Sequence, residues 1–226
     1  MTESVPSRFA KALRGETPDD RLPVVEWATW WDLTVRAWEV QGLPRGLSVS
    51  DLHRYWGLDP HEQLWIWPMA ASARPEDGRP HWIQSADDYR SIKHLLYPRD
   101  RWFDNAVWDA HGLRQAAGEQ VNWVTFQGFF WWPRVLMGVE NHFTAFYDLP
   151  EVMHEINQGL ADHILFAFRK ACDSFQPTWA TIAEDMAYNH GPMIGKNLFD
   201  EFIAPYYRQI VPAFKELGVP LIVDTD

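Results

Sequence analysis

Apolar segments of two kinds alternate along this chain of 226 residues. Near its end, apolar residues recur every three or four positions, as on the buried face of a helix: Leu198, Phe202, Tyr206, Ile210, Phe214 and Leu217. Gly218 then caps the helix, and the short apolar run VPLIVD follows as a strand. The same order recurs upstream, which predicts strands around Val24, Ile66, Val124, Ile182 and Ile222. Strands that alternate with helices form parallel βα units, so the sequence predicts an α/β fold.

Capping residues and prolines predict where several helices begin and end. Ser85 is expected to cap a helix that stops at Pro98, and Asp148 to open a capping box with Glu151. Pro205 and Pro212 are expected to kink or subdivide the last helix.

The number of strands bears on the architecture. Five strands can complete a doubly wound sheet, whereas a (β/α)8 barrel needs eight and about 250 residues. No glycine-rich phosphate-binding motif follows any expected strand, so the usual mark of a nucleotide-binding sheet is missing. No linker, low-complexity tract or repeat divides the chain, which favours one domain.

Charge and composition argue against several classes of protein. The formal net charge of -11 disfavours binding to nucleic acid or to an anionic membrane. The lone cysteine, Cys172, excludes an intramolecular disulfide. No apolar run approaches the roughly 18 residues of a membrane span, and the amino-terminal segment lacks the apolar core of a signal peptide. We therefore expect a cytoplasmic protein.

Acidic and amide side chains gather where the expected strands end. In either architecture, chemistry collects beyond the carboxyl ends of the strands. The residues at those ends are Glu26, Gln127, Glu184, Asp185, Asp224 and Asp226. Clustered carboxylates could hold a hard metal ion, perform general acid/base chemistry or grip N–H groups of a ligand. His190, just past a strand end, is a candidate proton donor.

Aromatic side chains lie beside the same strand ends. The chain has 14 tryptophans, most of which we assign to the core. Trp27, Trp131 and Trp132 could instead wall a pocket for a large flat ligand, and Arg134 could contact its carboxylates.

Three stretches resemble the uroporphyrinogen decarboxylase superfamily, which includes the cobalamin- and coenzyme M-linked methyltransferases. They are RFAKALRGETPDDRLPVVEW, FQGFFWWPRVLMGVENHFTAFYDLPEVMHEI and AEDMAYNHGPMIGKNLFDEFIAPYYRQIVPAFKELGVPLIVDTD. The resemblance implies a (β/α)8 TIM barrel with the ligand at the carboxyl-end mouth. Family members are considerably longer, so residues 1–226 are expected to be the amino-terminal portion of such a domain, incomplete at its carboxyl end, with about five parallel strands.

The chain departs from both branches of that family. The arginine-rich loop of the decarboxylases is replaced by VEWATWW, and the tyrosine of their GAPWTL-like block has no counterpart in GFFWWPRVLM. The zinc motif His-x-Cys of the methyltransferases falls where this chain has Asp224-Thr225-Asp226. Two carboxylates are harder ligands than thiolate and imidazole, and suit the activation of a thiol poorly.

The expected activity is therefore cofactor-independent decarboxylation of a porphyrinogen-type or related polycarboxylate. Asp224, Asp226, Glu184 and Asp185 would grip the pyrrole N–H groups, and His190 or an acid would supply a proton. The alternatives are corrinoid-dependent methyl transfer with a corrinoid protein partner, or a non-catalytic ligand-binding barrel. No metal is required, although Asp224 and Asp226 could bind a divalent ion. An open edge at the strand around Ile222 would favour a homodimer.

Overall fold

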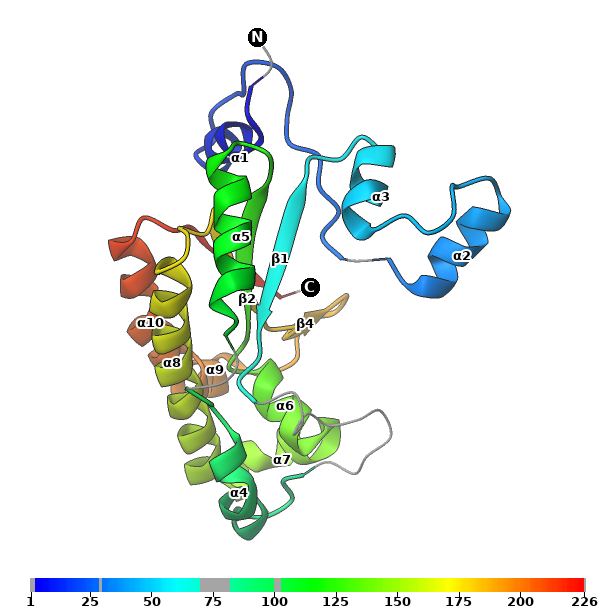
Figure 1. The fold of residues 1–226 in the computed structure, drawn as a ribbon. Coiled ribbons are helices and arrows are strands. Elements are labelled where there is room, and N and C mark those ends of the chain that lie inside the picture. Colours follow the sequence, from blue (N-terminus) through cyan, green and yellow to red (C-terminus); the bar gives the residue numbers. More distant parts are fainter. Residues whose placement is uncertain (1–2, 29, 70–81, 100–102, 226) are drawn as a thin grey trace. The chain divides into compact units, whose positions relative to one another are not determined.

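The computed structural model describes residues 3–28, 30–69, 82–99 and 103–225 (Figure 1). The chain divides into two compact units. The first comprises residues 1–62 and 110–122, and the second comprises residues 63–109 and 123–226.

Helices dominate the described residues. Those in the first part of the chain are α1 (Val5–Leu13), α2 (Asp32–Val40), α3 (Val49–Tyr55), α4 (Ala86–Ile92), the short 3-10 helix η2 (Lys93–Leu95) and α5 (Asn105–Ala116). The later ones are α6 (Trp131–Met137), α7 (Val139–Asp148), α8 (Pro150–Cys172), α9 (Lys196–Phe202) and α10 (Ala204–Glu216).

The main sheet has four strands in chain order. They are β1 (His61–Ile66), β2 (Val121–Gln127), β3 (Trp179–Ala183) and β6 (Leu221–Asp224). β3 pairs in parallel with β2 on one side and with β6 on the other. A helix separates each of these strands from the next, which confirms the predicted α/β fold with parallel βα units. The four strands are compatible with part of an α/β barrel.

The predicted strand around Val24 is wrong. Its backbone N–H donates to Oδ2 of Asp59, and its carbonyl accepts from the Asp59 N–H, both at 2.8 Å. Val24 is thus hydrogen-bonded to Asp59 and does not pair with a strand of the sheet. Val24 and Val25 are 45% and 38% exposed. An apolar run that resembles a buried strand therefore lies at the surface, and the described residues form four strands of the main sheet where five were expected.

Several helix ends match the sequence pattern and one does not. Ser85 caps α4, since its hydroxyl accepts a hydrogen bond from the N–H of Asp88. The last helix divides at Ile203 into α9 and α10, with Pro205 in the first turn of α10, as predicted. Pro212 lies inside α10, which continues to Glu216, so the helix is not divided there. The capping box at Asp148 is wrong. Asp148 is the last residue of α7, and α8 begins at Pro150 with Leu149 as its N-cap.

The core of the second unit lies where the sheet meets the helices. Phe168 of α8 and Phe214 of α10 stack with ring centroids 3.9 Å apart, and Phe126 of β2 meets Phe214 edge-on. Val124 and Ile182 belong to the same buried cluster. One face of the sheet is thus covered by helices, as in a βα unit. The opposite face differs in the polarity of its side chains.

Candidate functional site at the carboxyl ends of the strands

The two faces of the sheet differ in polarity. Side chains alternate along a strand, so residues in register across parallel strands share a face. The helix-covered face carries the apolar residues already named. The opposite face, here called the polar face, carries Trp123, Thr125 and Gln127 of β2, Trp179, Thr181 and Ala183 of β3, and Ile222 and Asp224 of β6. Trp123 and Trp179 stack with centroids 4.6 Å apart near its amino end, so the polar groups lie toward its carboxyl end.

Two hydrogen-bond acceptors face the same way at that carboxyl end. Gln127 and Asp224 are each in register with Ala183, which lies between them. Their Cα atoms are therefore about 10 Å apart, two strand spacings. Gln127 is buried, and among the described residues its Oε1 atom has no hydrogen-bond partner. Asp224 is half-buried. A buried acceptor without a donor costs free energy unless a ligand or water satisfies it.

Glu184 follows β3 but turns its carboxylate to the helix-covered side. Oε1 accepts the N–H of Phe129 at 2.9 Å, and Oε2 accepts the N–H groups of Phe130 and Trp131 at 2.8 and 3.3 Å. The hydroxyl of Tyr207 donates to Oε1 at 2.5 Å. A carboxylate has about four acceptor positions, so this one is fully occupied by the protein. The carboxylate that was expected from the sequence to grip a substrate is thus bound by four donors of the protein itself.

Burial dominates the electrostatics of this carboxylate. Burial raises the pKa of Glu184, and the hydrogen bonds from Tyr207 and from the three backbone N–H groups act against that rise. Burial and the neighbouring carboxylate together raise the pKa of Tyr207 well above its usual range. Gly128 is required beside them, because a Cβ atom there would lie 2.2 Å from the carboxyl carbon of Glu184.

Asp185 and Asp224 lie next to each other through the backbone. The carbonyl of Asp224 accepts the N–H of Glu184 at 2.9 Å and that of Asp185 at 3.2 Å. Asp185 adopts φ 41°, in the left-handed region that aspartate tolerates better than most residues. Of the expected group of four acids, Asp185 and Asp224 are thus adjacent, Glu184 is turned away, and Asp226 lies outside the described residues.

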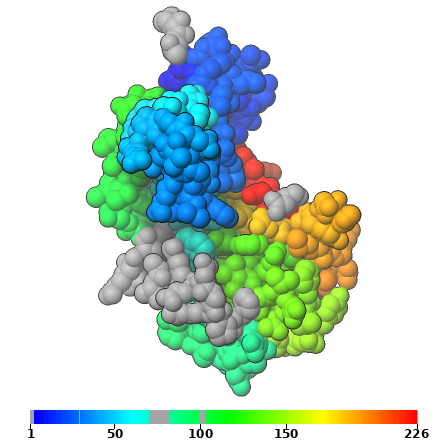
Figure 2. Space-filling view, turned by 90° about the vertical axis from the view of Figure 1, so that its right-hand side faces the viewer, coloured from blue at the N-terminus to red at the C-terminus, as the bar shows by residue number. Residues whose placement is uncertain are grey.

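His190 lies at the tip of a small hairpin. β4 (Ala187–Tyr188) and β5 (Gly191–Pro192) pair antiparallel, and His190 is exposed in the turn with its ring 5.6 Å from that of Tyr188. The orange surface in Figure 2 covers this part of the chain. In the described part of the chain, no hydrogen bond or ring contact joins His190 to Asp224 or Gln127, and its ring neighbour is Tyr188.

The aromatic residues of α6 have different environments. Trp132 is fully buried in the core, so it packs inside the protein and does not wall an open pocket. Trp131 is half-buried, and the guanidinium carbon of Arg134 lies 4.9 Å from its ring centroid, within cation–π range. Arg134 forms no ion pair with a carboxylate in the described part of the chain.

Glu26 and Trp27 belong to the first unit. The carbonyl of Glu26 lies 3.0 Å from Nε2 of His61, and Trp27 is 37% exposed. Because no strand forms around Val24, Glu26 does not lie at a strand end as expected from the sequence.

Sequence reasoning missed Tyr207 and Gly128. Tyr207 lies in the helix as one of two adjacent tyrosines, and the periodic pattern identified its neighbour Tyr206 as the core residue. Gly128 ends the run VNWVTFQG, and a glycine directly after a buried strand signals a close approach of another group. The sequence thus indicated a close approach at Gly128, but it did not identify Glu184 as the group that approaches.

Among the described residues, no group of three or more His, Cys, Asp or Glu side chains could hold a metal ion. The expected pair of Asp224 and Asp226 falls partly outside those residues. None of the helices in the described ranges is both long and apolar enough to cross a membrane. No family model matches the chain, and no curated protein matches it.

Proposed function

We propose that the protein is an enzyme of the uroporphyrinogen decarboxylase type, which removes carboxylate groups as CO2 from an N–H-bearing polycarboxylate such as a porphyrinogen. The observation that supports this best is the pair of acceptors on the polar face. Gln127 and Asp224 point the same way about 10 Å apart, and Oε1 of Gln127 is buried without a donor. A ligand with several N–H groups on one rim would satisfy both.

The chemistry asks for stabilisation of a positive charge. Protonation of a pyrrole carbon places positive charge on the ring and its N–H group, and a fixed carboxylate such as Asp224 stabilises that charge. The C–C bond to the carboxylate then breaks, its electron pair returns to the ring, and CO2 leaves. A second proton on the exposed methylene carbon and loss of the first restore the ring, so that acetate becomes methyl.

Cations are also needed for the carboxylates of such a substrate. Arg134 is held over Trp131 and has no carboxylate partner among the described residues, so we assign it this role. A planar guanidinium on an aromatic ring is suited to bidentate carboxylate binding. Glu184 supports the site indirectly, because it fixes the turn that links Gln127 to Trp131.

The test uses the purified protein under anaerobic conditions. Incubation with uroporphyrinogen should yield coproporphyrinogen. The products are oxidised to porphyrins and measured by chromatography. Asp224→Asn should lower turnover about 100-fold, since it removes the charge and keeps the shape. Glu140→Gln, an exposed change on α7, is the matched control and should leave turnover unchanged.

A parallel incubation with methylcobalamin distinguishes the other enzyme class. Appearance of demethylated corrinoid, without any coproporphyrinogen, would replace decarboxylation by methyl transfer. Absence of both products would overturn the proposed activity and leave a binding protein.

A further inference from the structure

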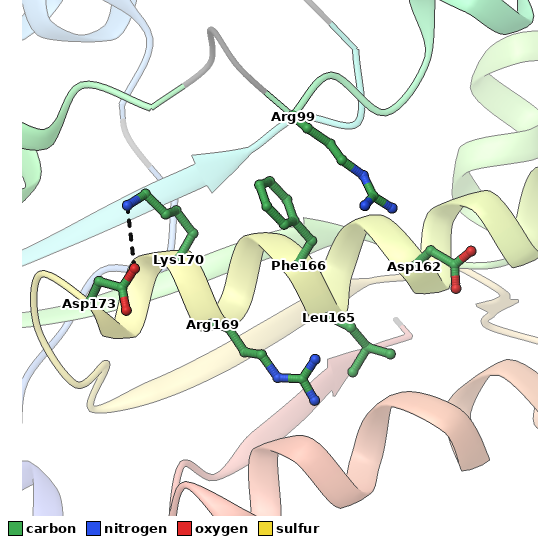
Figure 3. A pocket seen from close by; sticks show the side chains of 7 residues that line it. All are labelled: Arg99, Asp162, Leu165, Phe166, Arg169, Lys170 and Asp173. Atoms are coloured by element: carbon green, nitrogen blue, oxygen red, sulfur yellow. Dashed lines mark hydrogen bonds and ion pairs between the residues drawn. The ribbon is translucent and has the colours of Figure 1, made fainter.

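A cavity lies on the outward side of α8, and its lining contains no residue of the polar face. It measures about 450 Å³ and is lined by Arg99, Asp162, Leu165, Phe166, Arg169, Lys170 and Asp173 (Figure 3). The carboxyl end of α8 leads into the start of β3, whereas Gln127 and Asp224 lie at the ends of their strands. This cavity is therefore near the amino ends of the strands, whereas Gln127 and Asp224 lie at the carboxyl ends. A ligand bound in the cavity would not occupy the proposed substrate site.

Its charges are only partly neutralised by one another. Nζ of Lys170 pairs with Oδ2 of Asp173 at 3.3 Å, and Oδ1 of Asp162 accepts the amide of Gln158 at 3.0 Å. In contrast, neither Arg99 nor Arg169 forms an ion pair with a carboxylate in the described part of the chain. Three cations against two acids leave one positive charge, in a protein whose formal net charge is -11.

An apolar strip separates the two arginines. Figure 3 shows Arg99 reaching over α8 on the same side as Phe166, while Arg169 and Leu165 project from the other side of the helix. The guanidinium carbon of Arg99 lies 5.3 Å from the ring centroid of Phe166. That contact holds the guanidinium in place and leaves its N–H groups available to a ligand.

These features define the kind of ligand. A guanidinium group presents a rigid fork that matches a carboxylate, and the binding is charge-assisted. Leu165 and Phe166 offer contact to an apolar body, and the volume is in the range of small-molecule sites. A phosphate dianion carries two negative charges, whereas the cavity has a net charge of only +1. Its second charge would be repelled by Asp162 and Asp173, so a monoanionic carboxylate fits the cavity better. We propose that this cavity binds a small organic acid with one carboxylate on an apolar body of about the size of a phenyl ring.

The experiment compares an acid with its neutral amide. 3-Phenylpropionate is titrated into the full chain by isothermal calorimetry and by ligand-observed NMR, beside 3-phenylpropanamide and phenyl phosphate. Saturable binding of the acid is expected, with the amide at least tenfold weaker because it cannot accept the charge-assisted pair. Equal affinity of acid and amide, absence of saturable binding, or tighter binding of phenyl phosphate would overturn the proposal.

Variants locate the binding. Arg99→Gln and Arg169→Gln, each confirmed as folded by circular dichroism, should weaken 3-phenylpropionate at least tenfold. Lys93→Gln is the control, since Lys93 is an exposed cation paired with Glu155 outside the cavity. An unchanged affinity in both arginine variants would place any binding elsewhere and sink the assignment. Turnover of uroporphyrinogen does not enter this test, so its failure is distinguishable from failure of the proposed activity.

Discussion

The hydroxyl of Tyr207 donates a 2.5 Å hydrogen bond to Oε1 of Glu184, and thereby joins α10 to the turn that follows β3. The same carboxylate accepts three backbone N–H groups from residues 129–131, at the end of β2. One buried side chain thus ties together the segments after two neighbouring strands. The position of Gln127 on the polar face depends on this junction.

Replacement of Glu184 should therefore destabilise the second unit strongly. In Glu184→Gln, the amide nitrogen cannot accept the N–H groups that one carboxylate oxygen now accepts, and buried donors are left unpaired. We expect a loss of about 3 kcal/mol in the free energy of unfolding. Tyr207→Phe removes a single donor and should cost about 1 kcal/mol. Urea unfolding followed by tryptophan fluorescence measures both.

A double-mutant cycle adds a sharper check. Because the two side chains share a hydrogen bond, the losses in Glu184→Gln and Tyr207→Phe should not add. Strict additivity would contradict the direct contact.

Gly128 should tolerate no side chain. A Cβ atom there would lie 2.2 Å from the carboxyl carbon of Glu184 and 2.7 Å from the carbonyl oxygen of Ala183. Because the carbonyl is backbone in a central strand, neither neighbour can move cheaply, and Gly128→Ala should cost about 3 kcal/mol. The matched change is Gly195→Ala, where the close atom is the end of the exposed Asn197 side chain. A thermal-shift comparison should show a clear fall for the first variant and little change for the second.

His142 should make stability depend on pH. It is buried among Phe130, Phe143 and Phe146, and neither ring nitrogen has a hydrogen-bond partner among the described residues. Burial, with a smaller effect of Arg134, lowers its pKa to about 3. The unfolded chain binds the proton more readily, so this contribution is present above about pH 6.5 and is lost as pH falls toward 3.

The size of the effect follows from linkage. Each pH unit within that window lowers the free energy of unfolding by up to about 1.4 kcal/mol. His142→Phe should flatten the slope in urea unfolding between pH 7 and pH 5. An identical slope in His142→Phe and the parent protein would contradict the assignment.

The first unit should depend on one buried aspartate. The carboxylate of Asp59 accepts one hydrogen bond from the guanidinium of Arg8, two from that of Arg21 and one from the backbone N–H of Val24. Arg8 is itself buried, so Asp59→Asn leaves a charge short of a partner and should cost about 3 kcal/mol. Asp19→Asn, which removes an ion pair between the exposed Asp19 and the half-buried Lys11, should cost well under 1 kcal/mol. Hydrogen exchange across residues 5–13 reports both.

Local sequence signals were sufficient for most of the sheet. Helical periodicity followed by a short apolar run located β1, β2, β3 and β6 and their parallel order. The run around Val24 has the same composition, but its backbone is bound by Asp59, which is 35 residues away. A pattern of apolar residues does not reveal such a partner, so the fifth strand was expected where an exposed segment lies.

The sequence pattern placed Gln127, Glu184 and Asp224 at the carboxyl ends of neighbouring parallel strands, and the register of β2, β3 and β6 agrees with that placement. Which way each side chain turns depends on the register and on distant donors. Glu184 accepts a hydrogen bond from Tyr207, 23 residues later, and the sequence around Glu184 does not indicate that contact.

Two threonines on the polar face provide a matched test of whether that face is built to hold a ligand. Thr125 and Thr181 are buried and in register on β2 and β3. Oγ1 of Thr125 accepts the amide of Gln63 at 3.0 Å, whereas Oγ1 of Thr181 has no hydrogen-bond partner among the described residues. Thr125→Val should therefore cost about 1 kcal/mol, because the donor of Gln63 loses its acceptor.

Thr181→Val should behave oppositely in the free protein. It replaces an unsatisfied hydroxyl with a methyl group of the same shape, so stability should stay the same or rise by up to about 1 kcal/mol. If the polar face holds the substrate, the same variant should raise KM for uroporphyrinogen while stability is unharmed. Chemical denaturation and steady-state kinetics on the two variants separate these effects. Destabilisation by Thr181→Val comparable to that of Thr125→Val would mean that the hydroxyl already has a partner, and would remove Thr181 from the ligand-facing set.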